Sequence, residues 1–318
     1  MGLREFLRGF QLAAWTTVLT LTGAGAGHAG TMEIAIVTSR DIAPYRAAYQ
    51  GFLEVLDQAD IHYRTVEYRT ERDRRKSSQV VQKIRARRPD LILTIGSAAT
   101  EVVSGEIRDI PIIFSLVLEG GGGESSRGQN VTGASMDIPV RVQFEKIHQA
   151  LPEARRFGVL YNPSRTGKLI DEARTVAEEM QLELVPIAVE TEAEVVDRLA
   201  DLDGKIDLLW SVADPTVFTP QSVRYILLYT LRSRIPFIGL SPSYVRAGAL
   251  LSLSCDYRDV GRQAGEQAVQ VLQGSKPQHV PKTYPRTVST YLNLNTEKTL
   301  NLKIADPVRE AAEVVSDS

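Results

Sequence analysis

The chain has 318 residues, of which 43% are hydrophobic and 24% are charged, as in ordinary globular proteins, and its length suits two domains. A net charge of −2 gives no reason to expect a nucleic acid as the partner. The lone cysteine, Cys255, excludes an internal disulfide, and the histidines are too scattered for a metal motif. We therefore expect neither a metal nor another cofactor.

The N-terminus is unlike the rest of the chain. Arg4 and Arg8 precede an apolar, uncharged stretch at 11–27, and small residues lead to a possible cleavage point after Ala29. This layout is typical of a secretory signal peptide at 1–29. The alternative is a membrane anchor, but the stretch falls short of the about 20 apolar residues that span a bilayer. Export without disulfides predicts a periplasmic protein.

From Glu33 onward, short apolar runs alternate with amphipathic stretches. The apolar runs predict strands at 33–37, 65–68, 91–95 and 111–117. Apolar residues at helical spacing predict helices around 48–59 and 80–84, and a third that starts near Ala98.

The same rhythm then begins again after a helix predicted at 140–151. Strands are predicted at 157–161, 182–189, 207–212 and 236–239, with helices at 169–180, 195–199 and 223–231. Strands that alternate with helices imply parallel sheets covered on both faces. The sequence therefore predicts an α/β fold of two similar Rossmann-like lobes, joined by hinge crossings, with a ligand cleft between them.

The limits of the lobes follow from the segments that join them. The glycine run within 119–133 indicates a loop or hinge between the two series. The tail holds too few elements for a third domain, so we expect a helix at 259–273 to return to the first lobe and the chain to end on the second. The predicted lobes are 30–135 plus about 256–286, and 136–255 plus about 287–318. Hinge strands are predicted near 132–136, 252–256 and 286–288.

One strand-to-helix turn is built from unusually small residues. In open α/β sheets, ligands bind beyond the carboxyl ends of the strands, and the turn from Gly96 to Thr100 follows such an end. We expect Ser97 to cap the next helix, and the amides of Ala98, Ala99 and Thr100 to be free to hold an anion such as a carboxylate. An ordinary strand-to-helix turn would have the same residues, and that alternative stays open.

Two acidic residues follow strands predicted to end in the same region. Asp214 ends an apolar strand and precedes Pro215, and Asp256 follows another strand and precedes Tyr257. Each has a structural alternative, a turn for Asp214 and a helix cap for Asp256. An acidic pair opposite an anion-accepting helix start would fit a zwitterion.

Motifs of enzymes are missing. The chain has no Gly-x-Ser-x-Gly elbow, and Leu169 stands where a phosphate loop needs Ser or Thr after Gly167-Lys168. Neither His62 nor His148 is placed as a catalytic base. The arginine-rich run 64–88 is interpreted as a solvated face, with docking to a membrane partner as the alternative.

Several stretches together, in this order and spacing, resemble a known family. They are "LILTIGSAATEVV", "IPIIFSLV", "NVTGASM", "LPEARRFGVLYNPS", "IPFIGLSPSYVRAGALLSLSCDYRDVGRQAGEQAVQVLQGSKP" and "LNLNTEKTLNLKI". The chain resembles, from about Met32 to Val315, the solute-binding components of ABC transporters of the tryptophan/tyrosine type, which have a type I periplasmic binding fold.

The resemblance implies a two-lobed protein with a hinge that delivers a small solute to a membrane permease. It also implies that the turn from Ser97 to Thr100 holds the ligand carboxylate and that Asp214 and Asp256 hold the amine. The chain departs from the family where "LEGGGGESS", 118–126, replaces the Asp-Pro that often follows the fourth strand. The preference of the pocket for a particular side chain is therefore left open.

The sequence thus predicts a non-enzymatic, monomeric, periplasmic receptor that captures a small carboxylate-bearing solute, an amino acid or analogue, when its lobes close. Its expected partners are that solute and an ABC permease in the inner membrane. A periplasmic sensing module for a membrane signalling partner is the alternative, since the same fold would serve. The predicted ligand-binding residues are Ser39, Ser97, Ala98, Ala99, Thr100, Asn162, Ser164, Thr166, Asp214, Ser241 and Asp256.

Overall fold

The computed structural model describes residues 31–71, 73–118 and 128–315. The predicted signal peptide at 1–29 and most of the glycine-rich loop, 119–127, lie outside the described residues. Within the described ranges, no helix has both the length and the apolar character that a membrane crossing requires.

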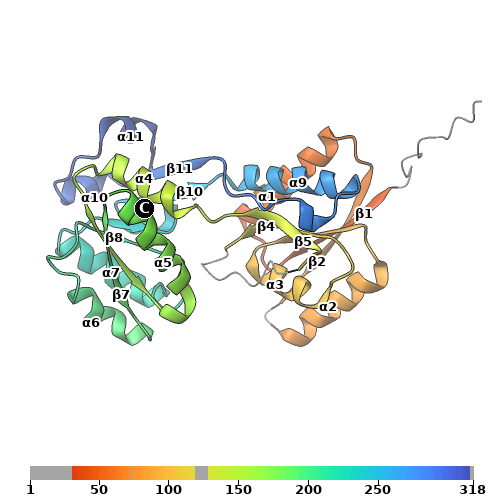
Figure 1. Cartoon of the computed structure of the whole chain (residues 1–318), viewed down its shortest axis with the longest axis horizontal. Coiled ribbons are helices and arrows are strands. Elements are labelled where there is room, and N and C mark those ends of the chain that lie inside the picture. Colours follow the sequence, from red (N-terminus) through yellow and green to blue (C-terminus); the bar gives the residue numbers. More distant parts are fainter. Residues whose placement is uncertain (1–30, 72, 119–127, 316–318) are drawn as a thin grey trace, which may run out of the picture. The chain divides into compact units, whose positions relative to one another are not determined.

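The first sheet has five parallel strands in the order β2-β1-β3-β4-β5 (Figure 1). Its strands are β1 (Met32–Thr38), β2 (Tyr63–Arg69), β3 (Leu91–Ile95), β4 (Ile112–Val117) and β5 (Val131–Ser135). The helices between them are α1 (Ala43–Gln58), α2 (Arg74–Arg87) and α3 (Ser97–Glu106). Every residue of β3 and β4 is buried, which explains why these strands read as continuous apolar runs.

Helices cover both faces of this sheet because alternate residues of a strand point to opposite sides. Ile34 and Ile36 of β1 belong to a core cluster that includes Phe52 of α1. Ala35 and Val37 belong to a separate cluster built against α2 and α3. The expected α/β layering is therefore present in this lobe.

The second sheet has seven strands in the order β12-β11-β10-β9-β8-β6-β7, parallel except for the β10–β11 pair. Its strands are β6 (Arg156–Tyr161), β7 (Glu183–Ala188), β8 (Leu208–Trp210), β9 (Phe237–Gly239), β10 (Leu251–Cys255), β11 (Val288–Leu292) and β12 (Glu313–Val314). Its helices are α4 (Val140–Ala150), α5 (Pro163–Glu179), α6 (Val195–Ala200), α7 (Pro220–Arg232), α8 (Pro242–Arg246), α10 (Leu294–Thr299) and α11 (Asp306–Ala311), with a short 3-10 turn η2 (Glu192–Glu194). A second 3-10 turn, η3 (Pro277–His279), lies against β5 of the first sheet. The fold class expected from the sequence, two lobes with parallel sheets, is confirmed.

Helix α9 (Tyr257–Leu272) follows β10 of the second sheet but packs on α1, beside which it lies in Figure 1. Glycines make this contact close: a Cβ added to Gly51 would lie 2.0 Å from the Arg258 carbonyl oxygen, and one added to Gly261 would lie 2.0 Å from the Ala48 carbonyl oxygen. After α9 the chain runs beside β5, where the Ser135 amide donates to the Thr283 carbonyl at 2.9 Å, and then returns to the second sheet as β11. The residue limits of the lobes and hinges stay predictions.

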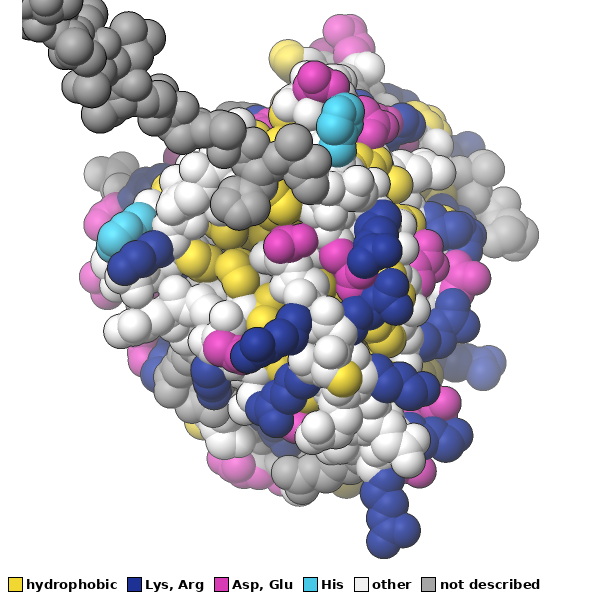
Figure 2. Space-filling model, turned by 90° about the vertical axis from the view of Figure 1, so that its right-hand side faces the viewer, with side chains coloured by type: hydrophobic (Ala, Val, Ile, Leu, Met, Phe, Trp, Pro, Cys, Tyr) yellow, Lys and Arg dark blue, Asp and Glu magenta, His cyan; other side chains and the backbone are white. Residues whose placement is uncertain are grey.

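In the arginine-rich run at 64–88, part of the positive charge is paired with acidic side chains. Figure 2 views the molecule from the side of the first sheet and shows many Lys and Arg side chains interspersed with Asp and Glu. Arg64 and Arg87 both pair with Glu33, and Lys76 pairs with Glu71 at 2.7 Å. These pairs support the interpretation of this region as a solvated face.

Candidate functional site

A cavity of about 640 Å³ lies at the carboxyl ends of β8, β9 and β10. This is the end of a parallel sheet at which α/β proteins bind ligands. Residues that follow these strands line it, together with the start of α4, one face of α5 and the segments on either side of α9. The volume lies within the range of cavities that hold small molecules.

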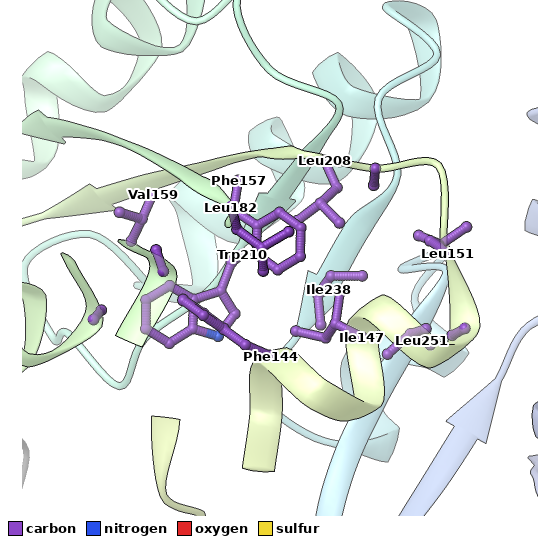
Figure 3. Packing of buried hydrophobic residues seen from close by; sticks show 14 of the residues in the cluster. Phe144, Ile147, Leu151, Phe157, Val159, Leu182, Leu208, Trp210, Ile238 and Leu251 are labelled. Carbon is purple, nitrogen blue, oxygen red and sulfur yellow. The ribbon is translucent and has the colours of Figure 1, made fainter. Parts of the chain in front are cut away.

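Aromatic packing makes one wall of the cavity rigid. Trp210 is buried and packs edge-to-face on Phe144 with ring centroids 4.9 Å apart, and Phe144 packs in the same way on Phe157 at 5.1 Å (Figure 3). The indole Nε1 of Trp210 donates to Gln143 Oε1 at 2.9 Å, and Gln143 Nε2 donates to the Ile138 carbonyl at 2.7 Å. Both polar ends of the Gln143 amide are therefore fixed, and the indole ring is held in one orientation.

The rest of the lining combines apolar, aromatic and acidic side chains. Tyr257 and Tyr284 supply two more rings, and Asp137 and Glu172 supply two carboxylates. The Cys255 thiol also lines the cavity; burial, with a smaller contribution from two nearby carboxylates, raises its pKa to about 12. The thiol is therefore protonated and unreactive at neutral pH.

The turn at Gly96 differs from the expected one. Gly96, not Ser97, is the N-cap of α3, so the predicted cap is wrong. The backbone needs a φ of 89° there, and a Cβ would lie 1.9 Å from the Tyr45 hydroxyl, so only glycine fits. Ser97 begins the helix instead, and its Oγ accepts from the Leu118 amide at 3.0 Å.

Because Gly96 is the cap, the helix begins one residue earlier than predicted, and the set of free amides shifts as well. The Thr100 amide, expected to be free, donates to the Gly96 carbonyl at 3.1 Å. Its buried hydroxyl bonds to Thr94 Oγ1 at 2.8 Å and to the Gly96 carbonyl at 3.0 Å. The first three helical amides, from Ser97 to Ala99, have no backbone acceptor among the described residues. An anion site at this helix start stays a prediction, with Ala98 as its exposed member.

In the second lobe, four predicted residues do come together: Asn162, Ser164, Thr166 and Asp214. The reason is topological, since Asn162 follows β6 and Asp214 follows β8, its neighbour in the sheet. Asp214 Oδ2 accepts from the Asn162 amide and from Thr166 Oγ1, both at 2.7 Å, and Oδ1 accepts from the Thr216 amide at 2.9 Å. The Asn162 side chain caps α5 through the Ser164 amide at 3.0 Å.

The Asp214 carboxylate is 1% exposed and its oxygens are occupied by these donors. This favours the structural alternative that the sequence left open for Asp214. A ligand contact of this cluster stays a prediction.

The other predicted residues lie near strand ends but apart from this cluster. Asp256 caps α9 by accepting from the amides of Arg258 and Asp259 at 2.9 and 3.1 Å, as in its structural alternative. Ser241 precedes α8, and Ser39 follows β1; both are half-buried.

The described lining of the cavity includes none of the eleven predicted residues, although it includes several of their chain neighbours, such as Ala213, Leu240 and Cys255. Sequence reasoning missed Gln143 and Glu172 because they lie within helices rather than in loops after strands. It missed Asp137, which follows β5, because the segment near 132–136 was predicted as a hinge strand rather than as a strand that carries the site. The sequence did contain a signal for Glu172: it lies three residues after Leu169 in a predicted helix, so the two side chains share a face.

Two sheets of doubly wound α/β topology with a cavity at the strand ends define the architecture of a two-lobed α/β binding protein. The model of the ABC transporter substrate-binding protein family matches residues 33–315, and the chain belongs to this family. Its members are solute-binding proteins rather than enzymes, which confirms the resemblance seen in the sequence.

Individual relatives agree with this assignment. A tyrosine-binding protein of Clostridioides difficile (strain R20291) is 28% identical over 234 residues, which cover 71% of this chain and 67% of that protein. The ligand-free, open structure of a substrate-binding protein with adhesive properties from Clostridium difficile has a TM-score of 0.75 at 22% identity, covering 91% of this chain and 100% of that one. An ABC domain from Streptococcus pneumonia in complex with L-Trp has a TM-score of 0.67 at 23% identity, covering 90% and 100%. At these identities the two structures show the fold alone.

Proposed function

We propose that the chain is the extracytoplasmic receptor of an ABC importer and captures an amino acid or a related carboxylate-bearing solute. The observation that carries the proposal is the cavity of about 640 Å³, whose lining places aromatic rings and carboxylates around one space. An amino acid offers matching parts: an ammonium group for a carboxylate such as Asp137, and an apolar body for the wall that contains Trp210. The names of the relatives, a tyrosine-binding protein and a domain in complex with L-Trp, support this class of solute.

The free amides at the start of α3 are the proposed partner of the solute carboxylate. They carry the positive end of the helix dipole, and Ala98 leaves the backbone approachable. Capture is a population shift: the solute stabilises the closed arrangement only to the extent that it binds that arrangement better than the open one. The signal peptide at 1–29 would direct the protein to the periplasm, where a monomer would present the loaded form to the inner-membrane permease.

The test uses protein that begins after Ala29. Thermal stability is measured with each of the common amino acids, and native mass spectrometry identifies any solute retained through purification. A rise in Tm is expected for at least one amino acid because a ligand that binds only the native state stabilises it. If no amino acid raises Tm and no retained solute carries a carboxylate, the proposal is wrong.

A variant pair tests the α3 contact. Ala98→Asp places a negative charge in the first turn, where it suits the helix dipole and leaves folding intact, but it repels a bound carboxylate. Ala98→Asn has nearly the same size without the charge. We expect Ala98→Asp to abolish the ligand-induced rise in Tm and Ala98→Asn to keep most of it. Equal behaviour of the two variants would remove α3 from the proposed site.

A further inference from the structure

The charges around the cavity are all of one sign among the described residues that line it. Asp137 and Glu172 are there, and no Lys, Arg or His of the described chain is. An amino acid with a neutral side chain brings one ammonium and one carboxylate. In such a lining its ammonium needs one of the two acidic groups, and its carboxylate has no cationic side chain to pair with.

If Asp137 pairs with the ammonium group of the solute, Glu172 is the acidic side chain that has no partner on a neutral amino acid. It lies on α5 three residues after Leu169, so the two side chains share the face of the helix that borders the cavity. Glu172 is exposed, in contrast to the half-buried Asp137, and this places its carboxylate at the mouth rather than at the floor. Asp137 Oδ2 also accepts from Ser135 Oγ at 3.1 Å, which ties it to the end of β5.

Two carboxylates, those of Asp256 and Asp137, also influence Cys255 in the cavity wall. The pKa of the Cys255 thiol is raised first by burial and then by Asp256 and Asp137. Both carboxylates therefore act on the side chain of a residue that lines the cavity. The nearby rings of Tyr257 and Tyr284 add negative ring faces, which attract cations when water is excluded.

We infer that the cavity selects solutes with a net positive charge, namely amino acids that carry a second cationic group, and that Glu172 is the residue that determines this selection. The inference rests on the proposed function and deepens it by naming the charge class of the solute. Glu172 pairs with the cationic group at the far end of the solute, while its α-ammonium lies nearer to Asp137. The aromatic wall holds the apolar part between the two charges.

The experiment compares three compounds of one shape by isothermal titration calorimetry: tyrosine, 4-(aminomethyl)phenylalanine and 4-carboxyphenylalanine, whose far ends are neutral, positive and negative. Lysine, norleucine and 2-aminoadipate form a second series with an aliphatic body. We expect the positive member of at least one series to bind about fivefold or more tightly than the neutral member, as for a pair worth roughly 1 kcal/mol, and the negative member to bind weakest. The preference should shrink as the salt concentration rises.

Variants identify the residue responsible. Glu172→Gln should bring the affinity for the positive compound down to that for the neutral one, without weakening the neutral one. Glu178→Gln, an exposed glutamate on the same helix that does not line the cavity, is the matched control and should change neither.

The two proposals fail in different ways. If no amino acid or compound of either series binds, the proposed function falls, and this inference with it. If neutral or negative compounds bind as tightly as the positive ones, or Glu172→Gln keeps the preference, the solute class is wrong while amino-acid capture stands.

Discussion

Replacing Asp214 distinguishes a structural carboxylate from a ligand-binding one. Its carboxylate joins the segments after β6 and β8 through bonds from the Asn162 amide, Thr166 Oγ1 and the Thr216 amide. Asn162 and Thr166 are themselves 4% and 2% exposed, so water does not replace a lost acceptor. Asp214→Ala therefore leaves at least two buried donors unpaired.

The expected cost follows from those two donors. Each buried, unsatisfied donor costs about 1–3 kcal/mol, so the free energy of unfolding should fall by about 2–6 kcal/mol. For a unit of this size, that corresponds to a drop in Tm of roughly 5–15 °C. Asp214→Asn should lie between wild type and Asp214→Ala, because its oxygen still accepts from one pair of donors while its NH₂ group faces the other.

Urea denaturation followed by circular dichroism measures the change without any ligand. Asp203→Ala is the control, since Asp203 is an exposed aspartate of the same lobe, and it should change the stability by less than about 0.5 kcal/mol. If Asp214→Ala is as stable as Asp203→Ala but no longer binds solute, the carboxylate serves the ligand and the structural reasoning is wrong.

Further predictions concern packing, acid stability and thiol chemistry. Gly261→Ala should destabilise the protein by about 1–3 kcal/mol because its Cβ would collide with the Ala48 carbonyl of α1, whereas Gly105→Ala in α3, with open space around its Cβ, should stabilise it by about 0.5–1 kcal/mol; urea denaturation of both tests this. Burial opposes ionisation of Asp207, but hydrogen bonds from the Arg156 side chain and from the amides of Arg155 and Arg156 lower its pKa overall. Its stabilising effect should therefore be present above the pKa of about 4 of an unfolded aspartate and disappear at lower pH, so that Asp207→Asn and wild type converge in stability near pH 2, and parallel curves would contradict this. With its pKa raised from 9.0 to about 12, the Cys255 thiol should react with a disulfide reagent at pH 8 on the order of 1,000-fold more slowly in the native protein than in urea, and equal rates would show the thiol to be accessible.

The alternation of apolar runs with helical periodicity determined the two-lobed α/β fold. The runs at 91–95 and 111–117 predicted β3 and β4 because strands buried on both faces need apolar residues throughout. The return of α9 to the first lobe was predicted from element order alone, and its packing on α1 agrees with that expectation. Local capping was not predicted correctly: Gly96 rather than Ser97 is the cap, and the contact with Tyr45, distant in sequence, leaves no room there for a side chain.

Some residues of the candidate site could likewise be predicted from the sequence, and others depended on the tertiary structure. Residues after strands, such as Asn162 and Asp214, could be found from the sequence because the ends of neighbouring parallel strands must meet. Whether they face a ligand or one another depends on hydrogen bonds formed only when the sheet assembles, and here they face one another. Among the side chains that do line the cavity, Asp137 follows β5 and Glu172 lies within α5, and their convergence depends on contacts between segments far apart in the chain. The sequence by itself thus determined the layers and the end of the sheet where the cavity lies, because both follow from local periodicity. Only the tertiary structure decided which charges meet there, because that depends on contacts between segments far apart in the chain.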